Sequence, residues 1–200
     1  MQWNGMKYSQ RLLELISKKH VNHRVEILKE SSLKDAHIYC KINELPGQIS
    51  GNLIEMYIQK KFEMVKNIAQ TCSGDLHFDS QNIEVKISLG GICCRQFNYV
   101  QIRLNHDIDY YLLTAYFISL ENVDKSGELF VFKIGKESIK TLILKYGAYA
   151  HGSVKNLGKI SLTQLNSLPN NNEYCLRPKH NSVFWKELLE HKTLEFDVTV

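Results

Sequence analysis

The chain has 200 residues, which is enough for one domain with at most a small appendage. Its hydrophobic share of 44% and charged share of 23% are ordinary for a globular chain, and a net charge of +4 does not identify a partner. No apolar run could span a bilayer and no signal-peptide core opens the chain, so we expect no membrane partner. The five cysteines lack metal-ligand spacing, and we expect reduced thiols in a cytoplasmic protein.

The amino-terminal quarter is predicted to contain a helix over residues 6–19 and short strands over residues 24–29 and 36–42. The helix has an apolar side that could pack on the core or on a second subunit.

A longer helix is predicted over residues 50–69, with Ser50 as its N-cap. Apolar residues recur along it at helical spacing. Glu55 lies in its first turns, where the helix dipole favours a carboxylate.

Residues 74–86 are predicted to form a tight β-hairpin, because apolar and polar residues alternate along them. If the loop has four residues, Asp75 lies opposite Lys86. His77 then lies opposite Glu84. These four side chains share one face, and the other face carries the apolar ones: Leu76, Phe78, Ile83, Val85 and Ile87.

Two carboxylates on one face repel each other unless a positive charge lies between them. Carboxylate oxygens are the ligands that Mg²⁺ prefers, and Mg²⁺ commonly takes one or two of them together with waters and phosphate. This face therefore indicates a magnesium site in which Lys86 contacts a water or a phosphate oxygen. The alternative is an exposed face with a cross-strand Glu–Lys pair.

Three further elements are predicted in the middle of the chain. A strand over residues 95–103 would turn Gln101 and Arg103 toward the carboxylates if it adjoined the hairpin, or would place them on an edge if it did not. Residues 109–120 form a continuous apolar run, which indicates a buried strand, with residues 127–134 as its neighbour. A helix over residues 136–145 would stop at Gly147.

The positive charge concentrates late in the chain. Residues 133–179 carry seven lysines and one arginine against two glutamates, a net charge of +6, while the whole chain carries +4. Glycines, aromatic rings and amides in residues 145–179 would suit DNA recognition, whereas the alternative is a solvated loop. The candidate phosphate contacts are Lys155, Lys159 and Arg177, and the candidate base contacts are Tyr149, His151 and Asn156. A closing helix is predicted over residues 182–191.

Asp75, followed after eight residues by Glu84-Val85-Lys86, resembles the signature of the PD-(D/E)XK nucleases, which most Type II restriction endonucleases carry. Gly74 stands where this signature usually has a proline. The resemblance implies an α/β (α+β) fold with a restriction endonuclease-like core, in which helices flank a central mixed β-sheet. It implies a single nuclease domain with its catalytic core over about residues 50–145 and DNA recognition over about residues 145–180.

The resemblance also implies roles for individual residues. Asp75, Glu84 and the carbonyl of Val85 would bind Mg²⁺, Glu55 would support the same or a second ion, and Lys86 would orient the attacking water. The chain would then be a Type II restriction endonuclease that cuts double-stranded DNA as a homodimer. A junction resolvase or mismatch nickase of the same fold, a non-catalytic DNA-binding module and a scaffold protein remain open alternatives.

Overall fold

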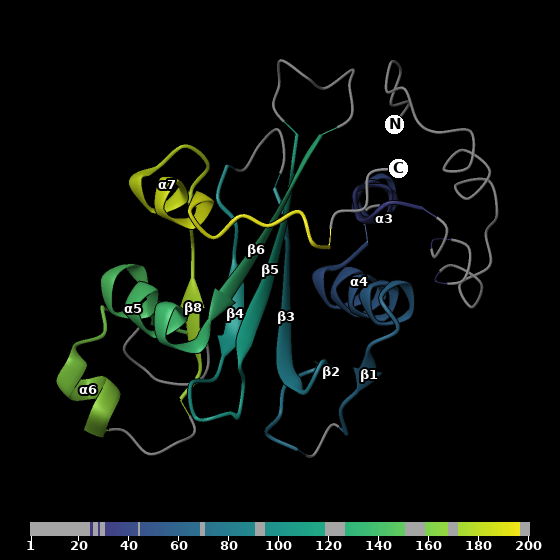
Figure 1. Ribbon diagram of the computed structural model, residues 1–200. Helices are drawn as coiled ribbons and strands as arrows, with labels where there is room; N and C mark the ends of the chain where they lie inside the picture. The colour runs from purple at the N-terminus through teal and green to yellow at the C-terminus, as the bar shows by residue number, and fades with distance from the viewer. Residues whose placement is uncertain are drawn as a thin grey trace.

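A mixed five-stranded β-sheet forms the centre of the protein (Figure 1). The computed structural model describes residues 25, 28, 31–43, 45–68, 71–90, 95–118, 127–150, 159–167 and 172–196. The strands of the sheet follow the order β1 (Val65–Lys66), β2 (Leu76–Phe78), β3 (Gln81–Leu89), β5 (Tyr110–Phe117) and β6 (Glu128–Gly135). Only the β3–β5 pair is parallel, and the other pairs in this sheet are antiparallel.

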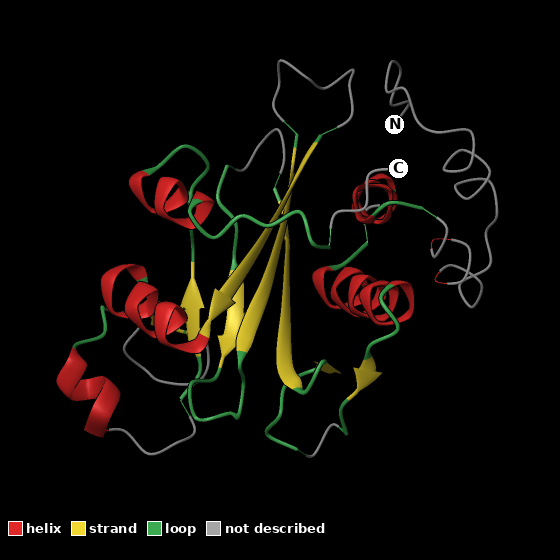
Figure 2. Cartoon of the chain, viewed as in Figure 1, coloured by secondary structure: helices red, strands yellow, loops and turns green. Residues whose placement is uncertain are grey.

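A second sheet of three short strands lies on one side of the first. Its order is β4 (Tyr99–Ile102), β8 (Tyr174–Leu176) and β7 (Ala148–Tyr149), with both pairs antiparallel. The helices are α3 (Leu33–Ile42), α4 (Gly47–Lys61), α5 (Lys136–Tyr146), α6 (Leu162–Ser167) and α7 (Val183–Leu189). Figure 2 shows α3 and α4 on one side of the central sheet, and α5 and α7 on the other side with the small sheet.

Two hydrophobic cores fill the spaces on the two sides of the central sheet. Strand β5 is buried along its whole length, and its side chains alternate between the cores. Tyr110 and Leu112 join the core beneath α3 and α4, whereas Tyr111 and Leu113 join the core beneath α5 and α7. This burial on both sides confirms the strand predicted over residues 109–120. The observed strand is shorter and spans Tyr110–Phe117. The neighbouring strand and the helix ending before Gly147 are also confirmed.

The hairpin forms, but with a shorter loop than predicted. His77 pairs with Asn82, and the turn consists of Asp79 and Ser80 alone, whose φ angles are 46° and 61°. Two consecutive positive φ angles give the primed turn that suits the twist of a two-residue hairpin. The register therefore differs from the prediction by two residues. Because side chains alternate with a period of two, the apolar and polar faces are still the predicted ones.

The two short strands predicted near the amino end are wrong where the structure describes them. Residues 36–42 belong to helix α3, which Ser32 begins with a capping box: Asp35 N donates to Ser32 Oγ at 3.0 Å, and Ser32 N donates back to Asp35 Oδ2. Val25 and Leu28 are helical and buried as well. The predicted helix over residues 6–19 lies outside the described residues.

Helix α4 begins three residues earlier than predicted and ends eight residues earlier. Pro46 holds the N-cap position, and Ser50 lies inside the helix, where its hydroxyl donates to the carbonyl of Gly47 at 3.1 Å. After Lys61 the chain turns through Glu63, whose φ is 54°, and continues into β1. This early end adds a strand to the sheet next to the hairpin.

The described parts of residues 145–179 contain regular elements in addition to loops. Strands β7 and β8 and the short helix α6 lie in this region. Tyr149 and Tyr174 stack with ring centroids 5.8 Å apart inside the second core. Among the described residues, no helix combines the length and apolar character needed to cross a membrane.

Candidate active site

The carboxylate of Asp75 completes the hairpin ladder beside Glu84. The amide of Val85 donates to Asp75 Oδ2 at 2.9 Å, so a side chain takes the place of a main-chain acceptor at this point. Asp75 N in turn donates to the carbonyl of Ile83 at 2.8 Å. These two bonds fix Asp75 against the middle of β3.

Gly74 explains how the chain reaches this position. Its φ is +74°, and a Cβ atom there would lie 2.6 Å from the carbonyl oxygen of Ile83 and 2.7 Å from Cδ1 of Ile108. Proline cannot adopt a positive φ, and any side chain would collide with main-chain atoms. The departure from the usual signature is therefore a requirement of this backbone.

Glu84 and Lys86 lie on the same face of β3, two residues apart. Lys86 Nζ donates to Glu84 Oε1 at 2.5 Å, and the side chains are 15% and 7% exposed. Glu84 also lies level with Tyr111 of β5. A glutamate this deeply buried requires a partner, and Lys86 provides it.

Glu55 reaches the same site from α4. Its charge interacts with those of Asp75 and Lys86, although it comes from a different element. Its hydrogen-bond partner is Lys66 of β1, whose Nζ lies 3.0 Å from Glu55 Oε1. The sequence did not point to Lys66, because the strand that carries it was assigned to a helix.

The carboxylates of Glu55 and Glu84 both resist ionisation. Burial is the main cause that raises the pKa of Glu84, and the charge of Asp75 raises it further, while Lys86 opposes both. Burial likewise raises the pKa of Glu55, with Asp75 adding to the effect and Lys66 opposing it. A cation near Asp75 would offset the negative charge of Asp75 and so lower the pKa of both Glu55 and Glu84.

The donor chemistry of this site fits Mg²⁺, but the donors are not gathered around a point. Across the described part of the chain, no three His, Cys, Asp or Glu side chains are placed to hold one metal ion together. Each carboxylate already has a partner: Lys66 for Glu55, the Val85 amide for Asp75, and Lys86 for Glu84. Mg²⁺ needs only one or two carboxylates with waters, so Asp75 and Glu84 would be sufficient after a rearrangement of Lys86.

His77 shares the polar face but is engaged elsewhere. Its Nδ1 lies 3.1 Å from Oδ1 of Asn82, its cross-strand partner. The Asn82 amide group donates to Asp107 at 3.3 Å. His77 therefore belongs to a network that holds the hairpin next to its turn.

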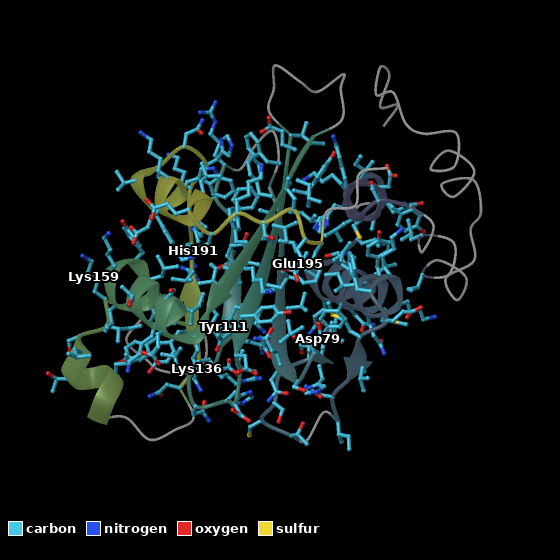
Figure 3. All side chains as sticks on the ribbon, viewed as in Figure 1. Asp79, Tyr111, Lys136, Lys159, His191 and Glu195 are labelled. Carbon is cyan, nitrogen blue, oxygen red and sulfur yellow. The ribbon has the colours of Figure 1, made fainter. Side chains whose placement is uncertain are left out.

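The loop between β4 and β5 is bound by two residues that the sequence did not single out, Tyr111 of β5 and Lys136 of α5. Tyr111 OH donates to the carbonyl of Arg103 at 3.1 Å, and Lys136 Nζ donates to the carbonyl of His106 at 2.6 Å. Figure 3 shows Tyr111 and Lys136 at the end of the sheet where the hairpin lies. Burial and the charge of Glu84 both raise the pKa of Tyr111. These contacts join distant segments, which no local sequence pattern reveals.

Strand β4 does not adjoin the hairpin, since β3 pairs with β2 and β5. Arg103 nevertheless lies near enough to lower the pKa of Glu84, and its guanidinium is bound by Glu173, with Nε 2.9 Å from Oε1. Gln101 is exposed at a bulge in β4 and has a φ of 56°. Its side chain is available at the surface.

The predicted recognition residues have different surroundings. Tyr149 is 4% exposed and belongs to the core, which conflicts with a role in reading bases. Lys159 and Arg177 are exposed, and Arg177 Nε donates to Asn98 Oδ1 at 3.1 Å. In Figure 3, Lys159 lies on the side of α5 and α6, away from Asp79 in the hairpin turn. His151, Lys155 and Asn156 lie outside the described residues.

No family model matches the chain, and no curated protein shows significant similarity to it.

Proposed function

We propose that the chain is a Mg²⁺-dependent endonuclease that hydrolyses phosphodiester bonds in double-stranded DNA at specific sites, as Type II restriction endonucleases do. The observation that carries this proposal is the burial of Glu84 beside a second carboxylate, Asp75, with Lys86 on the same face. A sheet that only had to fold would be as stable or more stable with apolar residues here. Buried carboxylates with raised pKa values are typical of sites that bind cations or transfer protons.

Each residue of the site has a distinct role in this proposal. Asp75, Glu84 and the carbonyl of Val85 would hold Mg²⁺, and Glu55 would support the same ion or a second one. Bound there, the ion would make a water more acidic and stabilise the charge that develops on the leaving oxygen. Lys86, released from Glu84, would orient the attacking water or neutralise the phosphate.

DNA recognition is assigned to exposed side chains outside the carboxylate site. Lys159 and Arg177 are exposed, and we propose that they contact phosphates. We retain Lys155, His151 and Asn156 as proposed contacts. Arg103 interacts electrostatically with Glu84, and we propose that Arg103 and the exposed Gln101 contact the DNA next to the cut. Alanine at Lys159 or Arg177 should weaken binding to all sequences and reduce its salt dependence if each contacts a phosphate.

A symmetric dimer would provide the two active sites that a double-strand break requires. Helix α7 is the described candidate for the interface, because Val183 and Leu189 expose 73% and 39% of their surface. We also propose a cytoplasmic protein. Cys40, Cys72 and Cys175 are free thiols in the structure, as a reducing compartment would require.

The experiment that tests the function is incubation with plasmid and genomic DNA in Mg²⁺ and in EDTA, followed by mapping of the ends. Discrete double-strand cuts that need Mg²⁺ would support the proposal. Cuts only at branched or mismatched DNA would indicate a repair nuclease, and binding without cuts would indicate a DNA-binding module. Glu128→Gln, an exposed carboxylate variant on β6, is a matched control that should retain full activity.

A further inference from the structure

The loop that joins β4 to β5 is fixed beside the segment that enters the hairpin. Asp107 N donates to the carbonyl of Cys72 at 2.7 Å. Ile108 packs so closely on Gly74 that a Cβ atom there would lie 2.7 Å from Ile108 Cδ1. Because Gly74 directly precedes Asp75, this loop lies next to the candidate active site.

His106 occupies the turn of this loop and has a fixed main chain. Its amide donates to the carbonyl of Arg103 at 3.3 Å, and its own carbonyl accepts from Ile108 N at 3.0 Å and from Lys136 Nζ at 2.6 Å. The imidazole is half-buried, and no hydrogen bond joins it to the rest of the described chain. These bonds fix the main chain of His106, and within the described residues the ring nitrogens remain available for a ligand.

Half of the charged groups that act on this ring belong to the candidate site. Its charged neighbours are Arg103, Lys86, Lys136 and Asp75, of which Lys86 and Asp75 are proposed catalytic residues. Burial lowers the pKa of His106, and the three cations lower it further. The lowered pKa favours the uncharged ring, and an imidazole N–H can donate a hydrogen bond to a ligand oxygen. Lys86 and Arg103 are paired with Glu84 and Glu173, so Lys136, whose ammonium contacts the carbonyl of His106, is the cation here that favours an anionic ligand.

We propose that His106 contacts the substrate in this site and donates a hydrogen bond from its imidazole to an oxygen of a DNA phosphate at or next to the cut. This inference rests on the proposed nuclease function and adds a residue to it. Lys136 would act as a positioning residue, since its ammonium holds the main chain of His106 and leaves the ring free.

The test compares His106→Ala and His106→Gln with the wild type in cleavage of a mapped DNA site. Alanine should lower kcat by about tenfold or more, which corresponds to one hydrogen bond to a charged oxygen. Glutamine, whose amide can donate the same bond, should restore part of that loss, and the melting temperature should stay unchanged in both variants. His191→Ala is the control, because His191 is also half-buried but lies at the end of α7, in a hollow that α5 also lines.

Two outcomes would overturn the inference while leaving the nuclease function intact. In the first, His106→Ala matches the wild type although Asp75→Ala and Lys86→Ala are inactive. In the second, alanine and glutamine lower kcat equally and both lower the melting temperature, which would show a structural role. A wild-type protein that cuts no DNA in Mg²⁺ would instead remove the proposed function, and this inference with it.

Discussion

Lys86 Nζ lies 2.5 Å from Oε1 of Glu84, two residues earlier on the same strand. The ammonium of Lys86 balances the charge of Glu84 on one face of β3. The buried glutamate is therefore stable without a metal ion. A metal that binds Glu84 must compete with this ammonium. The proposed site therefore has two states, one in which Lys86 pairs with Glu84 and one in which Lys86 faces the substrate.

The first prediction follows from this competition. Lys86→Met leaves Glu84 buried without its cation, so it should lower the melting temperature in EDTA. Mg²⁺ should raise the melting temperature of this variant more than that of the wild type, because a ligand that binds only the folded state stabilises it. Calorimetry with and without Mg²⁺ measures both effects. The double variant Glu84→Gln/Lys86→Met is the control and should not respond, and a response equal to that of Lys86→Met would place the ion elsewhere.

The second prediction concerns Glu55. Glu55→Gln should lower the cleavage rate by about tenfold or more at low Mg²⁺, since it removes a charge that supports the ion. The melting temperature should hardly change. Lys66→Gln breaks the same ion pair but keeps the carboxylate, so it should leave the rate nearly unaltered. Equal losses of cleavage rate in both variants would show that the rate depends on the ion pair and not on support of the metal by Glu55.

The third prediction uses the backbone at Gly74. Gly74→Ala should destabilise the protein by roughly 1–3 kcal/mol, because alanine at a positive φ is strained and its Cβ would collide with the carbonyl of Ile83. Gly135→Ala is a matched control, since φ there is −62° and no atom lies within 4 Å of the added Cβ. Chemical denaturation measures both. Equal stabilities for the two variants would contradict the close approach at Gly74.

The success of the sequence analysis at the hairpin has a simple physical reason. The predicted loop was two residues too long, but a shift of two preserves every face, so Asp75, Glu84 and Lys86 still lie together. Strand β5 was predictable for another reason: a run that is buried on both sides is apolar throughout.

The failures arise where local patterns compete or where the information is not local. Residues 36–42 alternate enough to suggest a strand, but the capping box at Ser32 starts a helix there. Tyr149 was predicted to read bases because its segment is rich in glycine and lysine and has no hydrophobic periodicity. Nothing local in the sequence indicates that its ring stacks on Tyr174. His106 and Lys66 reach the site from separate segments, and only the tertiary fold brings them there.

The fourth prediction is a pH dependence of stability. His37 is fully buried on α3, its Nε2 lies 3.0 Å from Thr114 Oγ1, and burial lowers its pKa to about 3. The unfolded chain takes up a proton near pH 6.5 and the folded chain does not, so stability is lost as the pH falls below 6.5 toward 3.

The expected loss from this residue is about 1.4 kcal/mol between pH 7.5 and 5.5. Denaturant titrations of the wild type and of His37→Gln at the two pH values measure it. Because other histidines titrate in both proteins, the difference between the two slopes isolates His37. Identical slopes would mean that His37 is protonated in the folded state as readily as in the unfolded one.

The most direct test of the nuclease assignment is the single-turnover cleavage rate of plasmid DNA for the wild type and for Asp75→Ala, Glu84→Ala and Lys86→Ala. We expect the wild type to cut in Mg²⁺ and not in EDTA. Each of the three variants should lose cleavage while it stays folded and still binds DNA in Ca²⁺. Full cleavage in EDTA, or by any one of the three variants, would contradict the assignment.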